Sequence, residues 1–448
     1  MAPAPITPES SGTTTPTGST ATSLTKAGIE HTQPNSNGST ESLAPLKASS
    51  MTINLTNTPR PVPAPDSAET KAQKTCTDHM ITARWTASHG WEAPELKPYG
   101  AFSIMPTASV LHYATECFEG LKLYRGYDGA LRFFRIGKNC QRMRKSASRI
   151  ALPDFEPAEL EKMILALAAQ DGAKWLPKDT RAGGFLYVRP TFIATEEALG
   201  VQRPKEALLY VIMACFPDMS KSLADPAPPA LKGEADGGSK SQTSGLRLLA
   251  SSEDSIRAWP GGFGYAKVGA NYGPSLVAQG EARARGFDQV LWLFGQESYV
   301  TEAGASNFFV VMRSKDSGKL QLITAPLGER IILEGVTRAS VIDLANERLA
   351  AAPTASESGL EPVEVVERRF TMPELLEAQA EGRLIEAFAA GTAFFIAPVA
   401  LIHFRGGDME VPMDGDSGRY ARCFKQWLVD IMWGNRSHEW GVVVEEKA

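Results

Sequence analysis

The chain has 448 residues, of which 43% are hydrophobic and 22% charged, and its formal net charge is −5 at pH 7. This composition is ordinary for a soluble globular protein, and the length favours two domains over one. The charge balance gives no reason to expect a nucleic-acid partner or an anionic membrane surface, and no apolar run reaches the roughly 18 residues of a membrane span. The five cysteines form no CxxC pair and the six histidines lack metal-ligand spacing, so we expect no metal site.

The first 73 residues differ in composition from the rest of the chain. Residues 1–73 are rich in Ser, Thr, Pro, Gly and Ala. Such a segment cannot bury enough apolar surface to offset its ordering entropy, so it is predicted to be a disordered extension. It has no apolar signal core, and its first arginine is Arg60, which is unlike an Arg-rich mitochondrial presequence. We therefore expect a cytoplasmic protein, with a mitochondrial location as the alternative.

Residues 74–223 have a globular composition and are predicted to form a small α/β domain. Residues 130–135 follow a Tyr-Asp-Gly turn, which indicates the second arm of a hairpin. A proline and an acidic first turn indicate a helix over residues 157–169. Apolar runs at 184–190 and 207–216 are typical of buried strands.

A break follows, and then a second domain. Residues 224–245 are full of Pro, Gly and Ser and predict an interdomain linker, so residues 246–448 form the larger domain. Thr371 and Glu374 have capping-box spacing for a helix that begins near Met372. The other elements predicted in this domain are helices over 273–285 and 335–350 and strands over 289–294, 307–312 and 320–324.

One lysine stands in a glycine-rich stretch. Residues 257–274 contain Lys267 and five glycines, and its neighbours are Ala266 and Val268. A lysine in small, apolar surroundings loses solvation, so its ammonium form is disfavoured and its pKa falls. A neutral amine can form a Schiff base with an aldehyde. The alternative is an ordinary lysine on a surface loop.

Two further features suit a pyridine cofactor that carries a phosphate. Glu302 lies between a strand and a Gly-containing turn, where a carboxylate could keep a ring nitrogen protonated, although a solvated turn glutamate is the usual interpretation. Gly335 begins a predicted helix whose N–H groups and dipole favour an anion, and Thr392 follows Gly391 with a hydroxyl donor. Each of these signals is weak by itself.

Several longer motifs occur in order along the chain. They are Leu-His-Tyr at 111–113, Cys-Phe-Glu-Gly at 117–120, Tyr-Val-Arg-Pro at 187–190, Ile-Arg-Ala-Trp at 256–259, Lys-Val-Gly-Ala-Asn-Tyr-Gly-Pro at 267–274, Gln-Val-Leu-Trp-Leu at 289–293 and Glu-x-x-x-x-Asn-Phe-Phe at 302–309. From about Trp91 to Trp440 the chain resembles the branched-chain aminotransferases, which are fold type IV pyridoxal-phosphate enzymes. The resemblance implies a mixed α/β (α+β) homodimer: a smaller N-terminal α/β domain, a larger C-terminal domain with a barrel-like sheet, and pyridoxal 5′-phosphate between them.

The resemblance also implies a role for individual residues. Lys267 would form the Schiff base and move the proton, Glu302 would bind the pyridine nitrogen, and Tyr272 would bind the phenolic oxygen. The phosphate would be held by Arg142, by the backbone of Val336 and Thr337, and by the hydroxyl of Thr392. The substrate pocket would be lined by Tyr113, Phe118, Tyr187 and Ala393. Arg189 lies in a matched motif and receives no role.

The implied activity is reversible transfer of the amino group of Leu, Ile or Val to 2-oxoglutarate, with glutamate and branched 2-oxo acids as the products. A D-amino-acid transaminase or an aminodeoxychorismate lyase would keep the same fold and cofactor. A non-catalytic binding protein with this fold is a third possibility, although it would be expected to have lost Lys267 or Glu302. Residues 391–398 contain no cysteine, which excludes a dithiol switch at that place.

Overall fold

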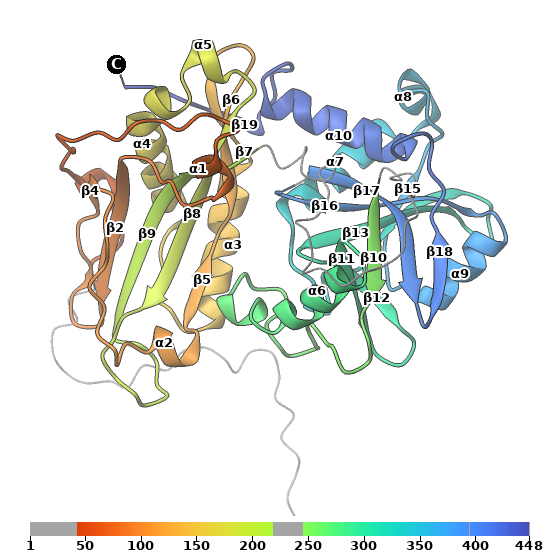
Figure 1. The fold of residues 1–448 in the computed structure, drawn as a ribbon, viewed down its shortest axis with the longest axis horizontal. Helices are drawn as coiled ribbons and strands as arrows, with labels where there is room; N and C mark the ends of the chain where they lie inside the picture. Colours follow the sequence, from red (N-terminus) through yellow and green to blue (C-terminus); the bar gives the residue numbers. More distant parts are fainter. Residues whose placement is uncertain (1–42, 218–244, 394, 448) are drawn as a thin grey trace, which may run out of the picture. The chain divides into compact units, whose positions relative to one another are not determined.

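The computed structural model describes residues 43–217, 245–393 and 395–447 (Figure 1). These residues form two β-sheets with helices packed against them. The disorder predicted for residues 1–42 and the linker predicted over 224–244 concern residues outside these ranges. Within the ranges, no helix combines the length and the hydropathy needed to cross a membrane.

The first sheet has ten strands and is antiparallel except where β1 pairs with β4. Its strands are β1 (Thr52–Ile53), β2 (His79–Thr86), β3 (Gly90–Trp91), β4 (Glu95–Pro98), β5 (Glu116–Phe118), β6 (Leu121–Arg125), β7 (Leu131–Phe134), β8 (Phe185–Ala194), β9 (Glu206–Cys215) and β19 (Gly441–Val444). The helices of this part are η1 (Ala48–Ser50), α1 (Ala68–Lys71), α2 (Val110–Tyr113), α3 (Ile136–Arg149), α4 (Pro157–Trp175) and α5 (Lys178–Arg181).

Helices α3 and α4 share one apolar core with the first sheet. In α4, Leu160, Ile164 and Leu167 are buried at a spacing of three and four residues, which places them on one helix face. Pro157 occupies the start of α4 and Glu159 its first turn, so the predicted helix is confirmed and extends further than predicted. The predicted hairpin is confirmed by the pairing of β6 with β7.

The second sheet closes on itself. Among the described residues, β12, β11, β10, β17, β16 and β13 form a closed barrel, because β12 also pairs with β13. The strands of this sheet are β10 (Leu246–Ala250), β11 (Gln289–Phe294), β12 (Tyr299–Ala303), β13 (Ser306–Arg313), β14 (Leu320–Thr324), β15 (Glu364–Glu367), β16 (Leu384–Gly391), β17 (Phe395–Phe404) and β18 (Gly407–Glu410). Its helices are η2 (Gly269–Asn271), α6 (Ser275–Ala284), α7 (Val336–Arg348), α8 (Ala352–Glu357), α9 (Met372–Ala380) and α10 (Arg419–Met432).

The elements predicted in this second part are confirmed, as is the barrel-like sheet. Strands β11 and β14 have the predicted bounds. At α9, the side chain of Thr371 accepts a hydrogen bond from the N–H of Glu374 at 3.1 Å, which is half of the predicted capping box. The carboxylate of Glu374 accepts hydrogen bonds from Arg368 at 2.6 and 3.1 Å, so it is engaged outside the helix.

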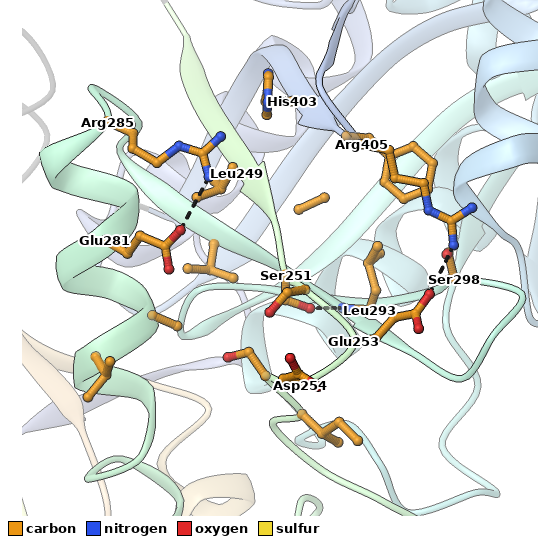
Figure 2. A pocket seen from close by; sticks show the side chains of 18 of the residues that line it. Leu249, Ser251, Glu253, Asp254, Glu281, Arg285, Leu293, Ser298, His403 and Arg405 are labelled. Carbon is orange, nitrogen blue, oxygen red and sulfur yellow. Dashed lines mark hydrogen bonds and ion pairs between the residues drawn. The ribbon is translucent and has the colours of Figure 1, made fainter.

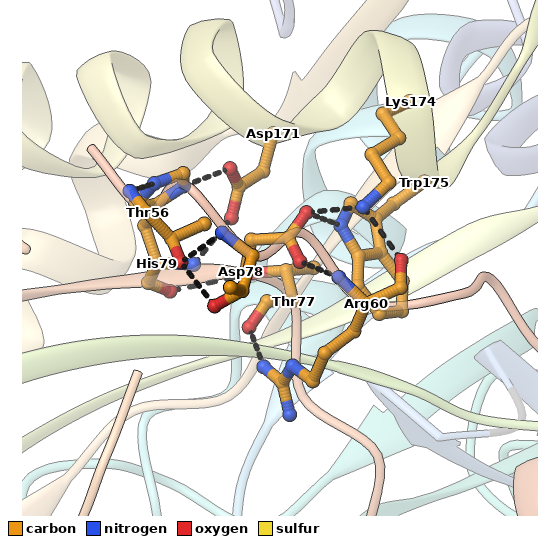
Figure 3. A network of polar contacts seen from close by, with 9 residues as sticks. Thr56, Arg60, Thr77, Asp78, His79, Asp171, Lys174 and Trp175 are labelled. Carbon is orange, nitrogen blue, oxygen red and sulfur yellow. Dashed lines mark hydrogen bonds and ion pairs between the residues drawn. The ribbon is translucent and has the colours of Figure 1, made fainter. Parts of the chain in front are cut away.

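The sequence predicts disorder throughout residues 1–73, and this is wrong for residues 43–73. Leu46 is buried in the core of the first sheet. The N–H of Arg60 donates to Asp78 at 2.7 Å, and Lys174 donates to Asp78 and to the carbonyl of Arg60, both at 2.6 Å (Figure 3). Composition did not reveal these contacts because they depend on polar partners far along the chain.

The sequence also assigns every residue after 246 to the second domain, and β19 contradicts this. After α10 the chain returns to the first sheet, where Gly441–Val444 pair antiparallel with β7. Beyond the strand, Glu446 accepts two hydrogen bonds from the buried guanidinium of Arg125, at 2.7 and 2.9 Å. Without this pairing β7 would be an edge strand, and the short apolar run 441–444 covers that edge.

Candidate active site

A cavity of about 650 Å³ lies where residues of the two sheets meet, and it contains most of the predicted site. Phe118 and Tyr187 reach it from β5 and β8, and Glu302 reaches it from β12. The predicted site residues that line the cavity are Phe118, Arg142, Tyr187, Lys267, Tyr272, Glu302, Val336, Thr337, Thr392 and Ala393.

A larger hollow, of about 780 Å³, lies beside β10 and α6 and contains none of the predicted residues (Figure 2). Four of its charged side chains form ion pairs: Arg285 with Glu281 at 3.3 Å and Arg405 with Glu253 at 3.2 Å. The hydroxyl of Ser251 accepts a hydrogen bond from the N–H of Leu293. We therefore assign the chemistry to the smaller cavity.

Lys267 is held on both sides by backbone hydrogen bonds. Its N–H donates to the hydroxyl of Ser146 at 2.8 Å, and its carbonyl accepts from the N–H of Phe118 at 3.1 Å. The short helix η2 then turns the chain so that Tyr272 faces the lysine, and Nζ donates to the Tyr272 hydroxyl at 3.0 Å. Nζ also lies 4.9 Å from the centre of the Phe118 ring. The amine is thus aimed into the cavity and is partly enclosed by aromatic rings.

Glu302 is buried, with 2% of its surface exposed. Its Oε1 accepts hydrogen bonds from Nδ2 of Asn307 and from the N–H of Leu333, both at 3.1 Å. Its Oε2 lies 2.8 Å from Nη1 of Arg257, but that contact lacks hydrogen-bond geometry, and Oε2 has no hydrogen-bond partner among the described residues. Burial raises the pKa of Glu302, and the charge of Arg257 opposes this rise. One carboxylate oxygen thus remains available to a donor in the cavity.

Hydrogen-bond donors converge at another part of the cavity. Val336 and Thr337 begin α7, where the first N–H groups have no partner within the helix, and Thr392 lies in the same lining. Arg142 lines the cavity as well, but its guanidinium is already engaged: Nε and Nη2 donate to Glu119 at 2.7 and 2.8 Å, and Nη1 donates to the carbonyl of Glu334 at 3.0 Å. This grouping of donors suits an anion.

Tyr113, which is predicted to line the substrate pocket, is not among the residues that line this cavity in the described chain. It ends the short helix α2, is 40% exposed, and its hydroxyl donates to the carbonyl of Leu199. The residue that follows, Ala114, has a left-handed conformation with φ 49°, and the chain turns there into β5. Closeness to Phe118 in sequence therefore did not place Tyr113 in the cavity.

Several residues in and beside the cavity were missed by the sequence argument. Arg257 and Asn307 hold Glu302, and Glu119 holds Arg142. Arg189 received no role, yet its guanidinium lies 4.6 Å over the Phe118 ring, its Nη2 donates to Tyr187 at 3.1 Å, and its buried Nε has no partner among the described residues. The motifs already contained Glu119, Arg189, Arg257 and Asn307, but only three-dimensional pairing gives them their contacts.

Comparison with known proteins agrees with this geometry. Residues 116–402 match the amino-transferase class IV family. The chain is 40% identical over 403 residues to the mitochondrial branched-chain-amino-acid aminotransferase of Schizosaccharomyces pombe, covering 89% of this chain and 86% of that protein. It is 41% identical over 410 residues to the cytosolic branched-chain-amino-acid aminotransferase of Saccharomyces cerevisiae, covering 90% of this chain and 99% of that protein.

Among solved structures, the branched-chain amino acid aminotransferase of Thermobaculum terrenum in its pyridoxal-phosphate form has the same fold. It aligns with a TM-score of 0.57 at 23% identity, covering 81% of this chain and 98% of that chain. The expected fold type is thereby confirmed. The chain belongs to the class IV aminotransferases, and the two yeast relatives compared above are branched-chain-amino-acid aminotransferases.

Proposed function

We propose that this chain is a pyridoxal-phosphate-dependent aminotransferase that exchanges the amino group of Leu, Ile or Val with 2-oxoglutarate. The observation that carries the proposal is the meeting, in one cavity, of Lys267 beside Tyr272 with the buried carboxylate of Glu302. The relatives in two yeasts and in the mouse are branched-chain-amino-acid aminotransferases, which agrees with this activity.

The cavity fits pyridoxal 5′-phosphate at three points. The Oε2 of Glu302, which accepts no hydrogen bond among the described residues, suits the N–H of a pyridinium ring. The N–H groups of Val336 and Thr337 suit a phosphate, and so does the nearby hydroxyl of Thr392. The amine of Lys267 suits an aldehyde. A volume of about 650 Å³ leaves room for an amino acid beside the cofactor.

When bound, the cofactor supplies a ring that accepts the electron pair left as the amino acid loses its Cα proton. Lys267 would take that proton from Cα and deliver it to the aldehyde carbon of the cofactor, because its amine stands on a flexible stem inside the cavity. The hydroxyl of Tyr272, 3.0 Å from Nζ, orients the amine. The carboxylate of Glu302 would hold a proton on the ring nitrogen by its negative charge.

The rest of the lining explains the choice of substrates. Phe118 and Tyr187 offer aromatic walls and Ala393 a small side chain, which favour branched aliphatic groups over charged ones. Arg189 places a cation among these rings, with its Nε unpartnered among the described residues. We assign that cation to the second carboxylate of 2-oxoglutarate and glutamate.

Absorbance and turnover test the proposal together. Purified protein should be yellow and should transfer the amino group of leucine to 2-oxoglutarate, while Lys267→Ala should lose turnover. Lys145→Ala, which removes an exposed lysine paired with Glu334, is the matched control and should retain turnover. Parallel assays with D-alanine and aminodeoxychorismate separate the sister activities. Full activity of the Lys267→Ala variant, or turnover of D-alanine alone, contradicts the assignment.

We propose that the chain is a homodimer. Five large apolar side chains are exposed close together around α2 and the 196–201 segment, which are joined by backbone hydrogen bonding from Ser109 to Glu196. They are Met105, Leu111, Tyr113, Leu199 and Val201, which are 51%, 60%, 40%, 58% and 86% exposed. A second copy of the chain would cover this patch, and Tyr113 would then complete the substrate pocket of the other copy.

Subunit mixing tests the dimer. Lys267→Ala removes the amine of its own site, and Tyr113→Ala would damage only the site of the partner copy. Each variant alone should therefore have low activity, and refolding the two together should restore part of it. Mixtures that show only the sum of the separate activities, or a monomer mass in sedimentation, contradict the proposal.

For the compartment we propose the cytoplasm. The relatives include cytosolic and mitochondrial proteins. The five cysteines are free thiols, which suits a reducing environment. Fractionation of cells that express the full chain checks this, and recovery with the mitochondrial fraction contradicts it.

A further inference from the structure

Helix α3 has a buried polar face beside the cavity. Asn139, Arg142 and Ser146 are 3%, 7% and 0% exposed. Their spacing of three and four residues places them on the same side of the helix. Polar groups are buried at a cost unless they are hydrogen-bonded, so this face must be explained by its partners.

The main partner is Glu119, which is 1% exposed. Its two oxygens accept hydrogen bonds from Nε and Nη2 of Arg142 at 2.7 and 2.8 Å, which makes the contact bidentate. A third hydrogen bond reaches Glu119 from Nδ2 of Asn139 at 2.8 Å. The carboxylate is therefore fixed by α3 on one side and by the end of β5 on the other.

The pair leaves Arg142 with a defined free edge. A guanidinium has five N–H groups, and three of them are used: two by Glu119 and one by the carbonyl of Glu334 at 3.0 Å. One N–H thus remains on each of Nη1 and Nη2. Arg142 lines the same cavity as Val336 and Thr337, and its bond to the carbonyl of Glu334 ties it to the residue that precedes Gly335 and the start of α7.

The same face of α3 also reaches the lysine. The hydroxyl of Ser146 donates to the carbonyl of Arg142 at 2.9 Å and accepts from the N–H of Lys267 at 2.8 Å. One hydroxyl thus joins the helical turn that carries Arg142 to the backbone that carries Lys267. This turn therefore links the anion end of the cavity to the backbone that carries the amine.

We propose that Glu119 is a positioning residue, which by its bidentate contact turns the free edge of Arg142 toward the phosphate of the cofactor. The inference rests on the proposed function, because it takes the anion to be that phosphate. Glu119 does not touch the anion itself, so its effect must pass through Arg142.

Two effects of Glu119 oppose each other, which makes the inference testable. The negative charge of Glu119 repels a nearby anion. If charge were the only effect, replacing Glu119 would therefore tighten phosphate binding. As a positioning residue, Glu119 holds the donors in place, so removal would weaken binding. The sign of the change separates the two.

The experiment uses cofactor-free full chain and titrates it with pyridoxamine phosphate and with pyridoxamine, followed by tryptophan fluorescence. Trp292 lies in the lining and provides a reporter. The variants are Glu119→Ala, Glu119→Gln, Arg142→Gln and the double variant Glu119→Gln/Arg142→Gln. The double variant carries no buried charge at the pair, so it folds even where a single unpaired charge prevents folding.

A matched control is Glu386→Gln. Glu386 is a second buried glutamate, 2% exposed, but its oxygens accept from the N–H groups of Tyr420 and Ala421 at the start of α10. Its variant should lower the melting temperature and leave both affinities unchanged. It thereby separates a general loss of stability from a loss of positioning.

We expect Glu119→Ala to weaken the binding of pyridoxamine phosphate about tenfold or more, because charge-assisted hydrogen bonds are misplaced. The binding of pyridoxamine should change little. Glu119→Gln keeps one acceptor and should lie between Ala and the native chain. The double variant should match Arg142→Gln. Unchanged or tighter phosphate binding in Glu119→Ala, or a double variant weaker than Arg142→Gln, overturns the inference. If Arg142→Gln itself has no effect on phosphate binding, the proposed cofactor site fails instead.

Discussion

Burial raises the pKa of Glu302, and Arg257 at 2.8 Å opposes that rise without cancelling it. In the folded chain without cofactor, the carboxyl group of Glu302 therefore keeps its proton to a higher pH than in the unfolded chain. The stabilising contribution is complete below the ordinary glutamate pKa and is lost as pH rises through the folded pKa. A carboxylate kept ready for a ring nitrogen thus lowers the stability of the empty protein at neutral pH.

Replacing Glu302 by Gln removes this titration. In urea unfolding of the cofactor-free protein, the free energy of unfolding of Glu302→Gln relative to the native chain should rise with pH by at most about 1.4 kcal/mol per pH unit above about pH 4.3, then level off. The loss of the partner of Arg257 shifts the variant by a constant amount. A difference that stays flat from pH 4 to 7 contradicts the prediction.

The meeting of Lys267 and Tyr272 could be predicted from a short motif, while the residues that support the site could not. Lys267 and Tyr272 are five residues apart, so a local turn suffices to bring Nζ within 3.0 Å of the hydroxyl. Arg257 and Glu302 meet only because β12 and the 251–259 loop border the same cavity. The partner of Tyr113 is likewise not local: its hydroxyl contacts Leu199.

At the start of helix α7, Gly335 stands where a side chain would collide with a neighbouring strand. A Cβ at this position would lie 2.0 Å from Oδ1 of Asn307. Asn307 cannot move away freely, because its Nδ2 donates to Glu302 at 3.1 Å and to the carbonyl of Leu333 at 2.9 Å. The glycine thus lets α7 approach β13 closely enough for both to serve the cavity.

We expect Gly335→Ala to displace Asn307 and to cost about 1–3 kcal/mol through its lost hydrogen bonds. Cofactor affinity should fall with stability. Gly280→Ala is the control, because Gly280 lies inside α6 with nothing within 4 Å of the added Cβ; it should stabilise by about 0.5–1 kcal/mol. Urea unfolding and cofactor titration check both variants. Equal behaviour of the two excludes the steric argument.

The segment 54–60 is held on the first sheet by two adjacent residues, the acid Asp78 and the base His79 (Figure 3). Burial by itself raises the pKa of Asp78, but hydrogen bonds from Lys174, the N–H of Arg60 and Trp175 outweigh it and leave the pKa below its ordinary value. This contribution is present above the ordinary aspartate pKa and is lost as pH falls through the lower, folded pKa. Next to it, His79 accepts from the N–H of Thr56 at 3.0 Å.

Asp78→Asn should release this segment at neutral pH. The hydrogen bonds that involve a charge contribute about 1.5–3 kcal/mol, so opening of residues 52–60 should become about tenfold or more frequent. Limited proteolysis with mass spectrometry measures the rate of cleavage there. Asp66→Asn makes the same charge change on an exposed residue and should leave the rate unchanged. Equal rates in both variants would remove Asp78 from this role.

Periodicity and capping residues predicted the elements inside each sheet. They did not predict the segments that pair with a sheet whose other strands are distant in sequence. β11 and β14 are bounded by turns that are visible in the sequence. Residues 43–66 and 441–444 have no such signal, because β1 and β19 are short strands at the edges of the first sheet. Their positions depend on partners such as Asp78 and Arg125.

Along the described chain, the first sheet comes first and the barrel second, and the last strand, β19, belongs to the first sheet again. The return is fixed by β19 on β7 and by the pair of Glu446 with Arg125, whose side chain is fully buried. Hydrogen bonding from Arg125 lowers the pKa of Glu446. Because α10 packs with the barrel core and β19 with the first sheet, this junction should make the two parts unfold together.

Glu446→Ala leaves the guanidinium of Arg125 buried without its carboxylate, and such a loss costs about 3 kcal/mol. The last strand should then detach, so the first sheet should melt before the barrel and the single unfolding transition should become two. Calorimetry checks this, and hydrogen exchange in β7 locates the first transition. Glu445→Ala removes an exposed neighbouring carboxylate and should keep one transition at the native temperature. One transition in both variants would show that β19 does not couple the sheets through Arg125.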